Sequence, residues 1–191
     1  MVRVPLLLLA PPRKGGEAAE DVDDSAPLDP ELLCRRYAPF VAAVALRLLG
    51  RDEEIEDAVQ DALAAAIRDL GQLREPGAVK AWLAKVTVRV CFRRIRARRL
   101  RSFLGLDRPP LYEHIAAPGL SPDDRDLLAR VYVLLDEQPA AERIAWTLRH
   151  VQGESLEEVA ALCRCSLATA KRRIQAVNKA LQRRLGDAGP R

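Results

Sequence analysis

The sequence predicts an all-α protein with two small helical domains, joined by a flexible linker, and a helix-turn-helix in the second domain. Its 191 residues contain few glycines (10) and few aromatic residues (4%), while Ala, Leu, Val and Arg dominate, which favours helices. Apolar residues recur at three- and four-residue spacing in two blocks. The expected domains are residues 28–101 and 125–186, with a linker at 102–124, a disordered tail at 1–27 and a short tail at 187–191.

The first block contains three expected helices. The first ends near Gly50, and Pro39 is expected to kink it or to mark a fresh start. The second covers 52–70 and carries acidic residues in its first turns, where the helix dipole favours them. After a loop with glycine and proline at 71–77, the third helix is expected at about 78–99. Its inward-facing residues are Val79, Leu83, Val86 and Val90.

The second block contains two expected helices, around 127–135 and at 140–152, followed by a helical hairpin at 155–185. In the hairpin, Ser155 and Glu158 have the spacing of a capping box, and Ser166 is expected to cap the second helix. The outer face of that helix is almost purely basic. Such a helix-turn-helix is suited to a DNA major groove, and the alternative is a solvated basic face on an ordinary hairpin.

Charge is strongly segregated along the chain, although the net charge is only +4. The acidic residues between 52 and 61 have no basic residue among them, and the segment 85–101 is basic with no acidic residue. This polarity indicates one surface for a polyanion and another for a basic protein partner.

The sequence contains no group of residues with the pattern of a catalytic or metal-binding site. Cys163 and Cys165, one residue apart and without a second pair, do not make a zinc site and are expected to pack as apolar side chains around the turn. Together with Cys34 and Cys91 they are expected to stay reduced. No Ser/His/Asp arrangement and no phosphate-binding glycine loop is present, so we expect no enzyme activity, cofactor or metal. The apolar stretch 4–10 is too short to span a bilayer and lacks a cleavage site, which predicts a cytoplasmic protein.

Three segments, in this order, resemble the extracytoplasmic-function (ECF) group of sigma-70-type RNA polymerase sigma factors. The segment GRDEEIEDAVQDAL (50–63) is similar to the acidic helix with which these proteins bind the polymerase clamp. The segment VKAWLAKVTVRVCFRRIRARR (79–99) is similar to their helix that engages the −10 promoter element. Residues 134–181 resemble their C-terminal domain, which recognises the −35 element. The resemblance covers about 32–185.

The resemblance implies three sets of functional residues. Those expected to bind core polymerase are Asp57, Gln60 and Asp61, which lie within about one helical turn. Those expected at the −10 element are Leu73, Lys80, Trp82, Lys85, Arg89, Arg93, Arg94 and Arg96. Those expected at the −35 element are Ser166, Thr169, Lys171, Arg172, Arg173, Gln175 and Lys179.

The sequence departs from the family's pattern at several of these positions. Leu73 stands where an aromatic residue is common, and Arg89 stands where Asn is frequent, which is expected to alter how a flipped base is held. Ala176 and Asn178 stand where basic residues are common, so the expected −35 contacts move to the other residues of that helix. Trp82 is expected to anchor the loop before its helix rather than to stack on a base.

The resemblance also implies the partners: the clamp and flap regions of core RNA polymerase, promoter DNA and an anti-sigma protein. It predicts a monomer that binds DNA weakly until polymerase is present. Two rival hypotheses are a degenerate sigma-like antagonist that opens no promoter, and a helix-turn-helix repressor. The repressor hypothesis predicts a stable dimer that binds DNA without polymerase.

Overall fold

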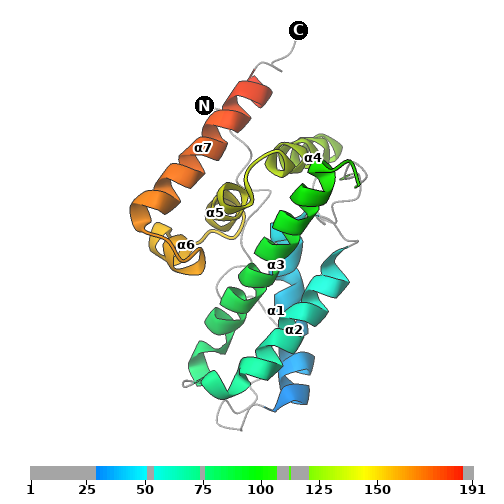
Figure 1. The fold of residues 1–191 in the computed structure, drawn as a ribbon, viewed down its shortest axis with the longest axis vertical. Helices are drawn as coiled ribbons and strands as arrows, with labels where there is room; N and C mark the ends of the chain where they lie inside the picture. Colours follow the sequence, from blue (N-terminus) through cyan, green and yellow to red (C-terminus); the bar gives the residue numbers. More distant parts are fainter. Residues whose placement is uncertain (1–28, 51–53, 74–75, 107–111, 113–120, 187–191) are drawn as a thin grey trace.

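The structure is a computed structural model, which describes residues 29–50, 54–73, 76–106, 112 and 121–186 (Figure 1). Over these ranges it is helical and contains no strand, so the all-α prediction is confirmed. The helices are α1 (Pro30–Leu49), α2 (Ile55–Asp69), α3 (Val79–Phe103), α4 (Pro122–Asp136), α5 (Ala140–His150), α6 (Leu156–Leu162) and α7 (Leu167–Gly186). Two short 3₁₀ turns, η3 (Leu70–Gln72) and η4 (Pro76–Ala78), lie between α2 and α3. Within the described ranges, no helix is both long enough and apolar enough to cross a membrane.

Helices α1, α2 and α3 pack against one another around a shared apolar core. All four residues of α3 that were expected to face inward are buried. The expected fresh start at Pro39 is wrong, because α1 continues through this residue. Tyr37 and Val41 on either side of Pro39 are buried, and this packing offsets the backbone hydrogen bond that proline cannot make. At its end, α1 stops at Gly50 as predicted, and Gly50 adopts a left-handed conformation with φ of 74°.

The helix-turn-helix has the predicted caps. Ser155 Oγ accepts a hydrogen bond from the Glu158 amide at 3.1 Å, and Glu158 Oε2 accepts one from the Ser155 amide at 2.8 Å. These two bonds form the expected capping box at the start of α6. At the start of α7, Ser166 Oγ accepts a hydrogen bond from the Thr169 amide at 3.2 Å. Because both caps are local contacts, three residues apart, the sequence alone was enough to predict them.

Helices occupy both ends of the segment that was expected to be a linker. Helix α3 continues to Phe103, and α4 begins at Pro122 with Ser121 as its cap. Between them, Tyr112 is buried and stacks on Tyr132, with 5.5 Å between the ring centroids. Linker residues 107–111 and 113–120 and the two predicted tails lie outside the described residues.

The two helical units pack directly against each other. Helix α5 contacts α1 and α3, and α6 also contacts α3, as Figure 1 shows. At this junction the Tyr132 hydroxyl donates a hydrogen bond to the Arg47 carbonyl oxygen at 2.8 Å. The Arg47 guanidinium donates to Gln152 Oε1 at 2.9 Å. The junction therefore joins the C-terminal end of α1 to α4 and to the segment that follows α5.

At this junction Gly50 lies against the Tyr132 ring, and this contact leads to a testable prediction. A Cβ atom at Gly50 would overlap that ring, and the φ of 74° is unfavourable for other residues. We expect Gly50→Ala to lower the free energy of unfolding by about 2–5 kcal/mol, from backbone strain together with overpacking. Denaturant unfolding followed by circular dichroism measures this change.

Gly105→Ala is the matched control for this prediction. Gly105 also has a positive φ, 68°, but a Cβ atom there would meet nothing within 4 Å. Its substitution should cost only the backbone term, about 1–2 kcal/mol. Equal losses in the two variants would mean that the Tyr132 ring does not press on Gly50.

Candidate polymerase and nucleic-acid interfaces

The residues expected to bind polymerase form an exposed patch on α2, with two carboxylates and one amide. Asp57, Gln60 and Asp61 are all exposed. Arg94 of α3 lies against this patch, since its Nη2 is 2.5 Å and its Nε 3.2 Å from Asp61 Oδ2. Its Nη1 is also 3.8 Å from Asp57 Oδ2. The structure thus places Arg94, which was expected at the −10 element, beside the predicted polymerase contacts.

This position of Arg94 leads to a second prediction. Arg94→Ala removes a cation that competes for the two carboxylates, so the affinity for core polymerase should rise a few-fold at low salt. The salt dependence of promoter binding by the assembled holoenzyme should stay unchanged, because Arg94 is paired with Asp57 and Asp61 of α2. Fluorescence titration at several salt concentrations measures both quantities.

Arg96→Ala is the control for the Arg94 variant. Arg96 is exposed on the same helix and makes no ion pair with a residue of the described ranges. Its removal should lower the salt slope of promoter binding by about one. If Arg94→Ala lowers the slope equally, Arg94 contacts DNA in the complex.

The other residues expected at the −10 element divide into two groups. Leu73 and Trp82 are half-buried and pack against the core. The exposed cations among the expected residues are Lys80, Lys85, Arg89, Arg93 and Arg96. Several of these follow one another at three- or four-residue spacing and form a basic stripe along α3. Arg89 lies 3.8 Å from Asp69 of α2 at the edge of this stripe.

Helix α7 has one buried and one solvent-facing side. The buried residues are Ala170, Ile174, Val177 and Leu181. Five of the residues expected at the −35 element are exposed: Ser166, Lys171, Arg172, Gln175 and Lys179. Thr169 and Arg173 are half-buried. The Ser166 and Thr169 hydroxyl oxygens lie 2.9 Å apart, so the two hydroxyls form a hydrogen bond with each other at the first turn of α7.

Asn178 has a structural partner that the sequence did not reveal. Its Oδ1 accepts a hydrogen bond from Nε1 of Trp146 at 2.8 Å. The Trp146 side chain is buried, and a buried indole N–H requires an acceptor. Asn178 therefore stabilises the contact between α5 and α7.

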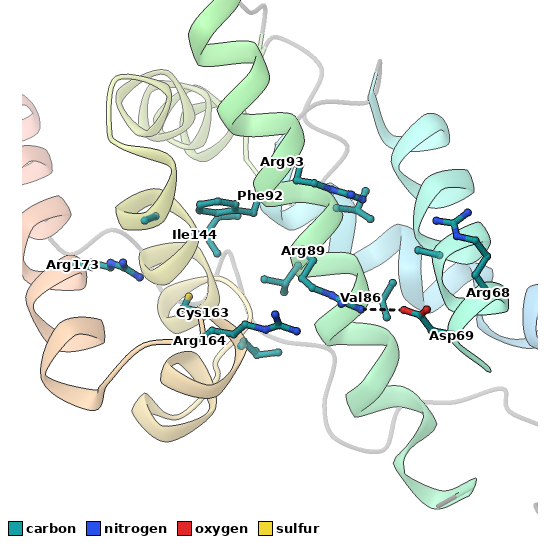
Figure 2. A pocket seen from close by; sticks show the side chains of 15 residues that line it. Arg68, Asp69, Val86, Arg89, Phe92, Arg93, Ile144, Cys163, Arg164 and Arg173 are labelled. Atoms are coloured by element: carbon teal, nitrogen blue, oxygen red, sulfur yellow. Dashed lines mark ion pairs between the residues drawn. The ribbon is translucent and has the colours of Figure 1, made fainter. Parts of the chain in front are cut away.

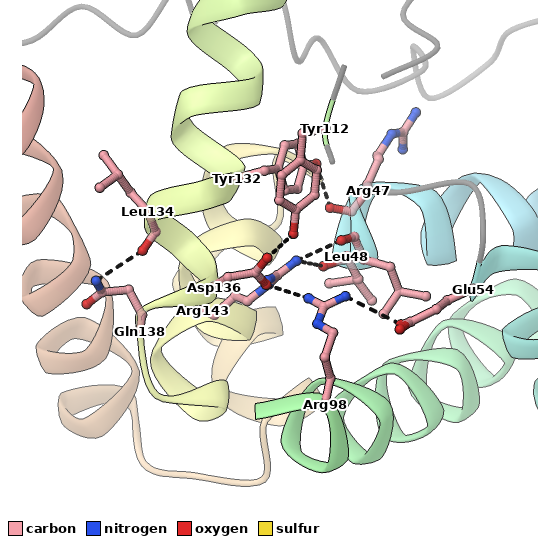
Figure 3. Close-up of polar contacts among 11 residues, drawn as sticks. Arg47, Leu48, Glu54, Arg98, Tyr112, Tyr132, Leu134, Asp136, Gln138 and Arg143 are labelled. Atoms are coloured by element: carbon pink, nitrogen blue, oxygen red, sulfur yellow. Dashed lines mark hydrogen bonds and ion pairs between the residues drawn. The ribbon is translucent and has the colours of Figure 1, made fainter. Parts of the chain in front are cut away.

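A buried polar cluster, which we call the domain latch, joins the two helical units (Figure 3). Asp136, at the end of α4, accepts hydrogen bonds from Arg143, Tyr112 and Arg98, the last at 2.5 Å. The Arg143 guanidinium, fully buried, also donates to the carbonyl oxygens of Leu48 at 3.2 Å and Leu49 at 2.8 Å. These carbonyls at the end of α1 have no partner within their own helix.

Carboxylates from both units neutralise the two arginines of the latch. The Arg98 guanidinium also lies 3.4 Å from Glu54, so one buried cation joins carboxylates of the two units. Burial raises the pKa of Tyr112 and of Tyr132, which keeps both phenols protonated and able to donate. The latch residues are Arg98, Tyr112, Asp136 and Arg143.

The cysteines pack as apolar side chains. Cys91 is buried, whereas Cys34, Cys163 and Cys165 are half-buried against the core, and none forms a disulfide. Burial raises the pKa of Cys91 to about 12 and that of Cys163 to about 11, which keeps both thiols protonated. Among the residues whose placement is described, no group of His, Cys, Asp and Glu has the arrangement of a metal site.

Comparisons with known proteins place this architecture in a family. The sigma-70 region 2 family matches residues 33–101, which span α1 to α3. The chain is 27% identical over 171 residues to the RNA polymerase sigma-H factor of Pseudomonas aeruginosa, covering 83% of this chain and 89% of that protein. It is 30% identical over 146 residues to the ECF RNA polymerase sigma factor SigE of Mycolicibacterium smegmatis, covering 74% and 56% of the two chains. The region 2 match and these relatives together support assignment of the chain to the ECF group of sigma-70-type sigma factors.

A solved structure supports the same assignment. The fold of this chain is similar to that of the sigma factor RpoE of Bartonella quintana, which was crystallised in complex with the anti-sigma factor NepR. The TM-score is 0.61 and the sequence identity 25%, over 82% of this chain and 96% of the other. The similarity extends beyond region 2, because region 2 alone would cover much less of either chain.

Proposed function

We propose that this ECF sigma factor binds core RNA polymerase, directs it to promoters with −35 and −10 elements, and promotes transcription initiation. The observation that carries the proposal is the arrangement of charge within this family fold. An exposed acidic patch lies on α2, and basic faces lie on α3 and α7. The factor itself would catalyse nothing, and it would act in the cytoplasm with the polymerase.

The first unit, α1 to α3, is proposed to provide two of the three activities. Asp57, Gln60 and Asp61 offer carboxylate and amide groups for arginines of the polymerase clamp. The basic stripe on α3 is proposed to contact phosphates at the −10 element, with Leu73 and Trp82 supporting a pocket for an unstacked base. A pocket of this kind can promote strand separation without nucleotide hydrolysis, because it binds only opened DNA.

The second unit, α4 to α7, is proposed to contact the −35 element and the polymerase flap. Arg172 and Gln175 are exposed on α7, and their side chains are suited to bidentate contacts with guanine and adenine. Lys171 and Lys179 are available for phosphates on the same helix. Because the solved relative RpoE was crystallised with an anti-sigma factor, we also propose that an anti-sigma protein controls this chain.

While the domain latch holds the two units together, α3 and α7 cannot contact both promoter elements at once. Arg93 of α3 and Arg173 of α7, each expected at a different element, line the same cavity. The names of the two elements place them about 25 base pairs apart, roughly 85 Å of duplex at 3.4 Å per base pair. The latch must therefore open when the factor enters the promoter complex.

Run-off transcription with purified core polymerase and a library of promoter sequences tests the proposed function. We expect transcripts only when the chain is added, from templates that share both elements. Tight polymerase binding without any transcript would support the antagonist instead. Binding of DNA by a stable dimer of the chain alone would support the repressor.

A further inference from the structure

A cavity of about 460 Å³ lies between the two helical units (Figure 2). Its walls come from α2 and α3 on one side, and from α5, α6, the helix-turn-helix turn and α7 on the other. The volume lies within the range of about 300–1,000 Å³ that is typical of small-molecule sites. Because both units contribute walls, the cavity exists only while they are packed together.

The floor of the cavity is apolar. Val86, Val90 and Ile144 are buried, and Phe92 and Leu162 are half-buried. These five side chains come from α3, α5 and α6. They offer an unbranched or ring-shaped apolar group a surface that is shielded from water.

Positive charges outnumber negative charges around this floor. The charged side chains are Arg68, Asp69, Arg89, Arg93, Arg164 and Arg173. Four of these arginines are exposed and Arg173 is half-buried, so the cations lie at the rim. Arg89 lies 3.8 Å from Asp69, and the other four arginines make no ion pair with a described residue. Figure 2 shows Arg164 extending from the turn toward Arg89 of α3.

Five cations around one carboxylate repel one another across the junction, which opposes packing of the two units. An anion at the rim would remove this repulsion, and arginine side chains pair with phosphate and carboxylate groups through two parallel hydrogen bonds. An apolar group attached to that anion would bury itself on the floor. The geometry thus favours one chemical class of ligand.

We propose that this cavity binds a small amphipathic anion, with an apolar body on the floor and a phosphate or carboxylate head among the rim arginines. The bound ligand contacts both units, so it stabilises the latched arrangement by mass action. It also covers Arg89, Arg93 and Arg173, which are expected to contact DNA. The ligand is therefore an inhibitor of promoter engagement; this last consequence rests on the proposed function.

Calorimetric titration of the full chain with dodecyl phosphate, below its micelle concentration, tests the binding directly. We expect one binding site. Dodecanol, which lacks the charge, and inorganic phosphate, which lacks the apolar body, should each bind at least about tenfold more weakly. Dodecanoate as a second probe distinguishes a carboxylate head from a phosphate head.

Two variants locate the site. Arg164→Asn removes one rim cation at a position with a positive φ of 48°, which asparagine tolerates. Ala65→Leu fills part of the floor. Each should weaken dodecyl phosphate binding by about tenfold or more. Arg130→Gln removes an exposed cation on α4, outside the cavity, and should leave binding unchanged.

Binding of several dodecyl phosphate molecules, or equal affinity for dodecanol, would overturn the proposal. Unchanged affinity in both cavity variants would overturn it as well. Transcription assays without ligand test the proposed function separately. A chain that transcribes but does not bind dodecyl phosphate refutes the cavity site alone, whereas a chain that binds it but supports no transcription refutes only the proposed function.

Discussion

Replacing Arg143 with methionine is expected to lower the free energy of unfolding by about 3–5 kcal/mol, because it breaks a buried charge network. The Arg143 side chain is fully buried, and its guanidinium binds Asp136 and the last two carbonyls of α1. Methionine occupies a similar volume but donates no hydrogen bond, so the Leu48 and Leu49 carbonyls would lose this buried donor and Asp136 would lose one of its two arginine partners. Urea unfolding measures the loss, and small-angle scattering detects separation of the two units.

Arg184→Met is the matched control for this substitution. Arg184 also pairs with a carboxylate, Glu137, at 3.1 Å, but both side chains are largely exposed. An exposed pair contributes at most about 1 kcal/mol, so the control should be nearly neutral. Similar losses in the two variants would show that the latch does not hold the units together.

The double variant Arg172→Ala with Arg173→Ala is expected to lower transcription from promoters that depend on the −35 element by at least about 30-fold. Each base or phosphate contact of this kind contributes about 1–3 kcal/mol, and two contacts act together. Affinity for core polymerase should be unchanged, because these arginines lie on α7, whereas the residues proposed to bind the polymerase clamp lie on α2. Run-off transcription and polymerase titration provide the two readouts.

Arg183→Ala with Arg184→Ala is the control for this double variant. It removes the same charge from the last turns of α7, away from the end that follows the helix-turn-helix turn. Transcription should fall only slightly. Loss of polymerase binding in the Arg172 and Arg173 variant would instead show that this face of α7 binds protein rather than DNA.

The features that the sequence predicted correctly depend on local spacing. Amphipathic periodicity is a property of single helices, so the buried side of α7 and the inward residues of α3 could be identified. The capping box of Ser155 and Glu158 involves residues three apart in sequence. The bounds were less exact where no cap was visible, as at the end of α3, which continues to Phe103.

The features that the sequence did not predict depend on tertiary packing. Arg94 meets Asp61, 33 residues away, and Trp146 meets Asn178, 32 residues away. No periodicity links such pairs. The latch combines side chains from α3, the segment before α4, α4 itself and α5, and its arginines were indistinguishable from solvated cations in the sequence. Only the packing of the two units shows that Arg98 and Arg143 are structural.

The distance between the two units measures most directly whether this chain is a sigma factor that opens to bind its promoter. Fluorophores introduced through unnatural amino acids at Ala64 of α2 and Gln182 of α7, both exposed, report this distance. We predict a short distance in the free chain and an increase of more than about 20 Å with core polymerase and promoter DNA, since the two elements lie far apart on the duplex. An unchanged distance in a complex that produces transcript would contradict the account.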